Sequence, residues 1–168
     1  YSVCSGYSWD YESLRESFIA LPGLTLYNNG DTERFEKVID STIRRHRDNM
    51  LQESDCPDSG LWFIRTIQQY VEYGADASSV WKKYGKWMVD IIESFLSNCR
   101  PSVRLHENGL LWAQKYGVAL TWMNTYVDGS PVSERPGYQV EVNALWYNAL
   151  CFVRDLDLKF GKGKLVQK

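Results

Sequence analysis

The stretch "SSVWKKYGKWMVDIIESFLSN", residues 78–98, decides the fold class. Its large apolar residues recur every three or four positions, at Val80, Tyr84, Trp87, Met88, Ile91 and Phe95. This interval matches the 3.6 residues of one α-helical turn, so the residues fall on one face. The stretch therefore predicts an amphipathic helix whose apolar face packs into a core.

Four other segments have the same spacing, and together the five predict a mainly α-helical protein. The segments are residues 13–24, 31–51, 58–74 and 140–160. Their expected core positions include Phe35, Val38, Ile39 and Ile43, then Phe63, Ile67, Tyr70 and Val71, and finally Val142, Leu145, Trp146, Ala149, Leu150 and Val153.

Helix start and stop signals flank these segments. Ser13 and Glu16 have the spacing of a capping box, and the dipeptide at residues 22–23, Pro-Gly, is expected to interrupt or end the first helix. Asp31 is the expected N-cap of the second helix, and Gly74 ends the third. These signals limit the helices to ordinary globular lengths.

A small β insertion is expected between the fourth and fifth helices. "SVRLHENGLLWAQ", residues 102–114, alternates around Asn108-Gly109, a dipeptide that favours a tight hairpin turn. Asp128-Gly129 supplies a second turn. Successive helices with short connections suggest stacked helical hairpins, as in an α/α toroid, and residues 1–168 are expected to form a single domain within it.

Composition excludes several classes of protein. The 168 residues are 44% hydrophobic and 14% aromatic, which is typical of a globular domain, and the net charge of −2 without a long basic run disfavours a nucleic-acid partner. No run of eighteen apolar residues predicts a membrane span. The four cysteines are far apart and favour free thiols in a reducing cytoplasm. No metal or organic cofactor is implied, and His106 is expected on a solvated face.

Some aromatic and acidic residues lie outside the strongest helical stripes. Trp9, Trp112 and Trp122 stand beside glycine, turn or polar residues, and each fits either a binding site or the core. Trp87 is expected in the core. Glu141 opens the last helix, where a carboxylate either complements the helix dipole or points into a cleft.

Several long motifs together carry a resemblance to one family. "GYSWDYESLRESFIALPGLTL", "DSGLWFIRTIQQYVEY", "ENGLLWAQ", "LTWMN" and "PVSERPGYQVEVNALWYNAL" follow one another in the order of that family. They closely resemble the C-terminal amylo-α-1,6-glucosidase domain of glycogen debranching enzymes, over residues 6–156. The resemblance implies the N-terminal half of an (α/α)6 barrel with a sugar cleft at one end, acting on glycogen or limit dextrin in the cytoplasm.

The resemblance also implies a set of cleft-facing residues. They correspond to Trp9, Arg15, Glu16, Asp58, Trp112, Trp122, Arg135, Glu141 and Asn143. Two motifs depart from the family pattern. "ESLRE" keeps Arg15 of Asp-Trp-Gly-Arg-Asp but has Glu16 in place of the last aspartate, and "DCPDSG" keeps only Asp58 of the next motif.

The most important departure is Asn124. The family motif ends Leu-Thr-Trp-Met-Asp, and the resemblance implies that this aspartate is the general acid, but this chain reads "LTWMN". An inverting glycosidase needs a protonated carboxyl group and a second carboxylate about 6.5–9.5 Å away. A carboxamide cannot deliver a proton, and the loss of a general acid slows the reaction by about 10²–10⁴-fold. The resemblance places the second carboxylate in the other half of the barrel.

Three hypotheses follow. The first is a debranching glucosidase domain, with its base supplied by chain outside these residues. The second is a non-catalytic α-glucan-binding module, and the third is a structural scaffold.

Because the sequence lacks an initiator Met, it is expected to be part of a longer polypeptide. The other half of the barrel or a second copy is expected to cover its apolar flank.

Overall fold

The computed structural model describes residue 3, residues 13–51 and residues 56–163, without the side chains of residues 47–50. Its elements are α1 (Leu14–Leu24), α2 (Leu26–Asn29), α3 (Thr32–Leu51), α4 (Ser59–Tyr73), α5 (Ala77–Leu96), β1 (Val103–Leu105), β2 (Leu111–Ala113), β3 (Tyr126–Val127), β4 (Ser130–Pro131) and α6 (Val140–Phe160). The five predicted helices are confirmed, and the short α2 follows the first of them.

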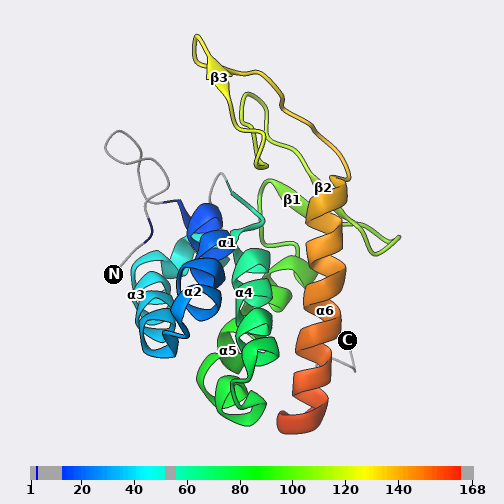
Figure 1. Cartoon of the computed structure of the whole chain (residues 1–168). Coiled ribbons are helices and arrows are strands. Elements are labelled where there is room, and N and C mark those ends of the chain that lie inside the picture. The colour runs from blue at the N-terminus through cyan, green and yellow to red at the C-terminus, as the bar shows by residue number, and fades with distance from the viewer. Residues whose placement is uncertain (1–2, 4–12, 52–55, 164–168) are drawn as a thin grey trace.

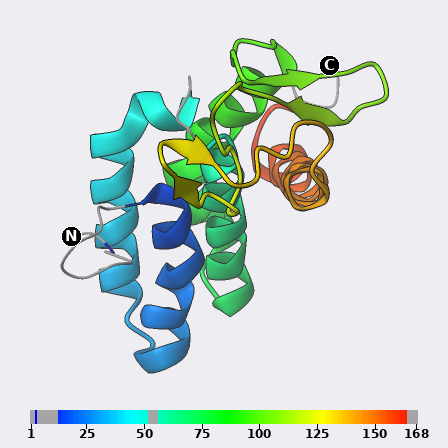
Figure 2. The same ribbon diagram turned by 90° about the horizontal axis from the view of Figure 1, so that it is seen from above.

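The helices form two rows. α1 contacts α4 and α4 contacts α6, whereas α3 contacts α5, so alternate helices of the chain belong to alternate rows. α3 and α6 lie at opposite sides of the molecule when it is seen from above (Figure 2). Both hairpins lie at the end of the helical array where α6 begins (Figure 1). This alternation is consistent with a partial helical barrel with a small β insertion, which confirms the predicted fold class.

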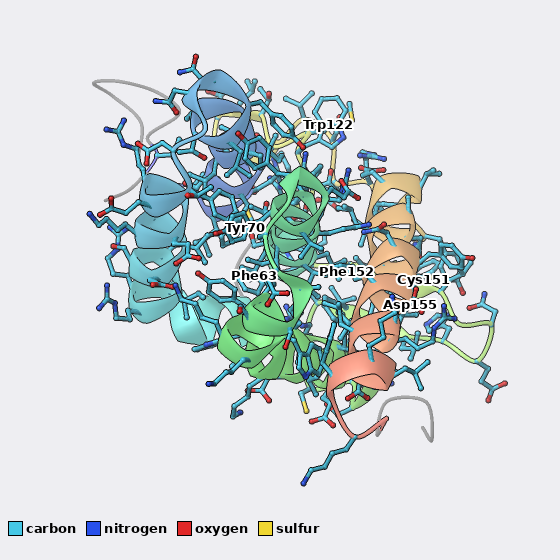
Figure 3. The ribbon with its side chains drawn as sticks, turned by 60° about the horizontal axis from the view of Figure 1, so that its bottom comes forward. Phe63, Tyr70, Trp122, Cys151, Phe152 and Asp155 are labelled. Carbon is cyan, nitrogen blue, oxygen red and sulfur yellow. The ribbon has the colours of Figure 1, made fainter. Side chains whose placement is uncertain are left out.

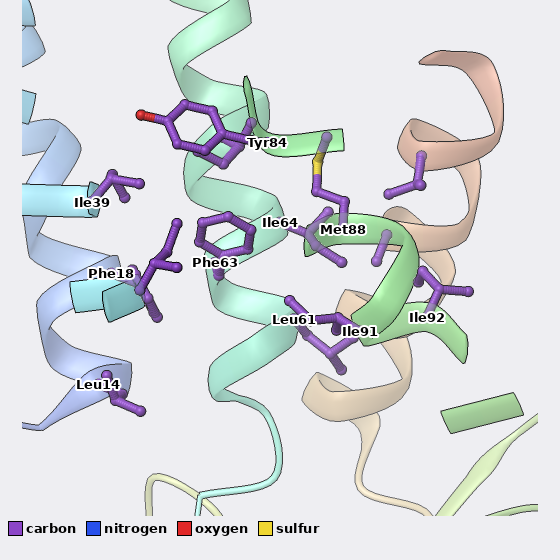
Figure 4. Close-up of a cluster of buried hydrophobic side chains, with 14 of the residues drawn as sticks. Leu14, Phe18, Ile39, Leu61, Phe63, Ile64, Tyr84, Met88, Ile91 and Ile92 are labelled. Carbon is purple, nitrogen blue, oxygen red and sulfur yellow. The ribbon is translucent and has the colours of Figure 1, made fainter. Parts of the chain in front are cut away.

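The core lies between the two rows. α1, α3, α4 and α5 contribute Leu14, Phe18, Ile39, Leu61, Phe63, Ile64, Tyr84, Met88, Ile91 and Ile92 to one cluster (Figure 4). Most of the expected core positions are buried, including Phe35 and Trp146. Four of them are only partly buried and pack against the core: Val71, Trp87, Leu145 and Leu150.

The predicted break at residues 22–23 is wrong, because α1 continues through Pro22 to Leu24. A proline inside a helix has no N–H to give to the carbonyl four residues earlier. That carbonyl belongs to Phe18, and it accepts a buried hydrogen bond of 2.8 Å from the hydroxyl of Thr66 on α4. A side chain of the neighbouring helix thus replaces the missing backbone donor.

The capping predictions had mixed outcomes. Asp31 caps α3 by accepting a 2.8 Å hydrogen bond from the amide of Arg34, as expected. Ser13 occupies the N-cap position of α1 but its side chain makes no capping hydrogen bond, so the predicted capping box is wrong.

Both predicted hairpins are present. β1 pairs antiparallel with β2, with Arg104 opposite Trp112, and β3 pairs with β4. The turn after β1 is longer than a two-residue turn: the amide of His106 donates to the carbonyl of Leu110 and Gly109 adopts a positive φ, which is typical of a three-residue loop. Asp128 and Gly129 both have positive φ and form the tighter turn.

The cysteines that the structure describes, Cys56, Cys99 and Cys151, are free thiols. Cys4 lies outside the described residues. Of the helices formed by the described residues, none combines the length and apolarity needed to cross a bilayer.

Candidate active site

A buried ion pair joins the first turn of α1 to the start of α4. Arg15 donates from Nε and Nη2 to the two carboxylate oxygens of Asp58, each at 2.8 Å. Their side chains are only 1% and 3% exposed. Asp58 is the N-cap residue of α4, where a negative charge is favoured by the helix dipole. The pair therefore fixes the relative position of two inner helices.

Arg15 also reaches the segment that contains the "LTWMN" motif. Its Nη2 donates a 3.2 Å hydrogen bond to the carbonyl of Leu120, while its Nη1 is buried and has no hydrogen-bond partner among the described residues. Burial alone would lower the pKa of Arg15, but the hydrogen bonds and charge of Asp58 raise it above its ordinary value. The guanidinium stays charged and holds the backbone of Leu120 against the helices.

A second ion pair lies on the other side of this segment. Arg135 donates from Nη1 and Nη2 to the two carboxylate oxygens of Glu141, at 2.5 and 3.0 Å. The same Nη1 donates a 3.1 Å hydrogen bond to the hydroxyl of Thr121. Arg135 has a φ of 49°, an uncommon conformation for a residue other than glycine. Because Glu141 lies in the first turn of α6, this pair anchors the segment to a third inner helix.

Glu141 is held as a carboxylate. The hydrogen bond from Arg135 lowers the pKa of Glu141, and a hydrogen bond with Trp122 lowers it further. At neutral pH the group can accept hydrogen bonds but has no proton to donate. Glu141 lies in the first turn of α6, where its charge complements the helix dipole, and about a third of its side chain is exposed. That it points into a cleft stays a prediction.

Trp122 and Asn124 project from the segment that these pairs fix. Trp122 is 61% exposed and lies near the start of α6 (Figure 3). Asn124 is exposed, two residues further along. The hydroxyl of Tyr126 accepts a 2.9 Å hydrogen bond from the amide of Ala119, which ties the next part of the loop back to the segment.

Glu16 belongs to the same end of the molecule. It lies in the first turn of α1, beside Arg15, and is half-buried. Its Oε2 atom is buried without a hydrogen-bond partner among the described residues. The starts of α1, α4 and α6, with the loop before α6, thus bring four predicted site residues to the Leu120–Trp122 segment: Arg15, Asp58, Arg135 and Glu141.

Two other predicted site residues lie apart from this network. Trp112, on β2, packs with His106 and Tyr138. Asn143 donates to the carbonyls of Leu111 and Gln139 and accepts from the amide of Leu111, at 2.8–3.1 Å. Its amide is used to join β2 to α6. Trp9 lies outside the described residues.

The sequence reasoning missed Thr121 and the carbonyl of Leu120, which connect the two ion pairs. Both flank Trp122 in the motif already singled out, so the motif itself was the signal. Among the described residues, no three His, Cys, Asp or Glu side chains are grouped to hold a metal ion.

Comparison with known sequences agrees with this arrangement. Residues 1–164 match the family described as amylo-alpha-1,6-glucosidase. No curated protein and no solved structure matches the chain. The match covers nearly the whole length, so this chain is a member of the amylo-alpha-1,6-glucosidase family.

Proposed function

We propose that the surface around the Leu120–Asn124 segment binds α-glucan at an α-1,6 branch point. Family membership makes the chain a glycoside hydrolase-like debranching domain. The observation that carries the proposal is the pair of ion pairs, Arg15 with Asp58 and Arg135 with Glu141, which hold this segment from both sides.

The chemistry of this surface suits a sugar. An indole ring offers an apolar face on which the C–H face of a pyranose stacks. The carboxylate of Glu141 beside it accepts hydrogen bonds from hydroxyl groups, and Arg135 keeps that carboxylate in place. Because the segment is already fixed in the free protein, little ordering entropy is lost when a glucan binds.

Turnover by this chain is expected to be low. The inverting reaction needs a proton donor at position 124, where the side chain is a carboxamide. Glu141 does not replace it, since its lowered pKa keeps it ionised at neutral pH. We infer an α-glucan binder with impaired hydrolysis.

Calorimetry with a branched limit dextrin, combined with an assay for released glucose, tests this proposal. We expect weak binding without glucose release. Hydrolysis by the chain as written would overturn the inferred impairment. A folded protein that binds no glucan would overturn the binding role and favour the scaffold hypothesis.

Restoring the acid gives a sharper test. In a polypeptide that also contains the remaining half of the barrel, Asn124→Asp is expected to raise the rate of glucose release about 10²–10⁴-fold. Asn29→Asp on α2 is the matched control, because Asn29 is exposed and its Oδ1 accepts a hydrogen bond from the amide of Asp31, as a carboxylate oxygen also can. Equal rates for Asn124→Asp and the unchanged chain would rule out position 124 as the acid site.

We also propose that the other half of the barrel, or a second copy, covers the free side of α6. This helix exposes Val140, Tyr147 and Leu158 to between 58% and 80%. Exposed apolar side chains on one helix favour association. Sedimentation at high concentration is expected to detect dimers, and a clean monomer would count against self-association.

The cysteines support a proposal about location. The described ones are free thiols, as is usual in a reducing cytoplasm, and we propose that the protein is cytoplasmic.

A further inference from the structure

A cavity lies beside the β1–β2 hairpin, and neither of the two ion pairs lines it. Its volume is about 330 Å³. None of the residues of the proposed glucan surface, Trp122, Asn124, Arg135 or Glu141, lines it. Pockets for small molecules range from about 300 to 1,000 Å³, so this cavity suits one small ligand.

Aromatic side chains form one part of this cavity. His106 and Trp112 have parallel rings, with centroids 5.8 Å apart and an interplanar angle of 9°. Tyr138 fixes both rings: it packs edge-on against Trp112 at 5.0 Å, and its hydroxyl lies 2.6 Å from Nδ1 of His106. His106 is exposed, as predicted, and also belongs to this aromatic group. Tyr116, which is 93% exposed, stands at the cavity as well.

Basic and polar side chains form the rest. Arg104 and Lys115 line the cavity, and none of the described lining residues is acidic. Gln114 adds an amide that can both donate and accept. The charged residues that line the cavity are therefore basic, in a chain whose net charge is −2. An anionic group is the complementary partner, and a phosphate uses such donors well.

Ser102 is an independent indication of a ligand. It lines the cavity and is only 5% exposed, yet its Oγ has no hydrogen-bond partner among the described residues. A buried hydroxyl without a partner loses free energy, and native proteins seldom keep one without a reason. A ligand oxygen in the cavity would satisfy it.

We propose that this cavity binds a phosphorylated hexose, with the sugar ring against Trp112 and the phosphate at Arg104. The aromatic side chains would pack against the sugar ring, and the basic side chain would bind the phosphate. The hydroxyl of Ser102 would form a hydrogen bond with a hydroxyl or phosphate oxygen of the ligand. A free hexose phosphate and a phosphate ester on a glucan chain share this chemistry. A mononucleotide would need room for a base as well as a sugar and a phosphate, which this small volume disfavours.

Calorimetry with glucose 6-phosphate, glucose, inorganic phosphate and AMP tests the chemistry. We expect glucose 6-phosphate to bind at least tenfold more tightly than either fragment, and its affinity to fall as salt is added. Equal affinity for glucose 6-phosphate and glucose, equal affinity for inorganic phosphate, tighter binding of AMP, or no binding would each overturn the proposal. Phosphorylated amylodextrin, before and after phosphatase treatment, distinguishes a chain-borne ester from the free sugar phosphate.

Two variants locate the site. Arg104→Gln is expected to weaken glucose 6-phosphate about tenfold, whereas Lys82→Gln on α5 leaves the affinity unchanged. Ser102→Ala should also weaken binding several-fold while leaving the free energy of unfolding unchanged or raised, because it removes an unpartnered buried hydroxyl. A purely structural Ser102 would give the opposite result, with lower stability and unchanged affinity. Trp122→Ala should leave the affinity for glucose 6-phosphate unchanged, so the glucan proposal can fail without affecting this one.

Discussion

The two arginine–carboxylate pairs at this end of the molecule have similar geometry but different surroundings. Both are bidentate, and both position the Leu120–Trp122 segment. The Arg15–Asp58 pair is almost fully buried, whereas about a third of each side chain in the Arg135–Glu141 pair is exposed. The first pair therefore lies inside the fold, whereas the second is open enough to meet a ligand, as the proposed glucan site requires.

The largest expected effect is on stability, at the buried pair. Asp58→Asn leaves Arg15 charged in a dry environment and is expected to lower the free energy of unfolding by about 3–5 kcal/mol. Urea denaturation measures this. Asp155→Asn, which breaks the exposed Arg154–Asp155 pair, is the matched control and should leave the free energy of unfolding almost unchanged. Similar decreases in the free energy of unfolding for the two variants would contradict a special structural role of the buried pair.

A buried but uncharged contact should have an intermediate effect. Thr66→Val keeps the shape of the side chain but leaves the carbonyl of Phe18 without a donor, at a cost of about 1–3 kcal/mol. Adding Pro22→Ala supplies a backbone N–H to the same carbonyl, so the double variant should lose less stability than Thr66→Val does. If the two substitutions are simply additive in denaturation experiments, Thr66 does not substitute for the missing donor.

The exposed pair should affect stability least of the three contacts. Glu141→Gln is expected to lower the free energy of unfolding by no more than about 1 kcal/mol, since partly exposed ion pairs are weak. It should nevertheless weaken glucan binding, because the carboxylate that accepts sugar hydroxyls is lost. A loss of stability as large as that of Asp58→Asn would remove the distinction between the pairs.

The pH dependence of the Glu141 contribution has a definite sign. Folding lowers the pKa of Glu141, chiefly through the hydrogen bond from Arg135. The stabilisation is therefore complete above the unfolded value of about 4.3 and is lost as the pH falls through the lower folded value. The difference in unfolding free energy between the wild type and Glu141→Gln should be constant near neutrality and shrink in acid. A difference that grows in acid would contradict this assignment.

The sequence predicted the helices well and the contacts between them poorly. Helical periodicity located α3 to α6 almost to the residue, because one apolar face repeats along each helix. It could not predict that α1 continues through Pro22, since the compensating hydroxyl of Thr66 lies on another helix. Local signals carry no information about such a long-range partner.

The same limit applies to the site. The motif resemblance selected Arg15, Asp58, Arg135 and Glu141, but it did not predict how they pair or that Leu120 and Thr121 lie between the pairs. It grouped Trp112 and Asn143 with them, whereas the structure gives these two residues other neighbours. A sequence motif indicates which residues belong to one functional region, but only the packing determines which of them are in contact.

The central claim is tested most directly by glucan binding to Trp122→Ala. Trp122 is 61% exposed, so its loss should change the free energy of unfolding by less than about 0.5 kcal/mol. Phe160→Ala, at the far end of α6, is the aromatic control. Calorimetry with a branched limit dextrin should detect binding by the wild type and Phe160→Ala and none by Trp122→Ala. Equal binding by all three proteins would contradict a glucan site at the Leu120–Asn124 segment.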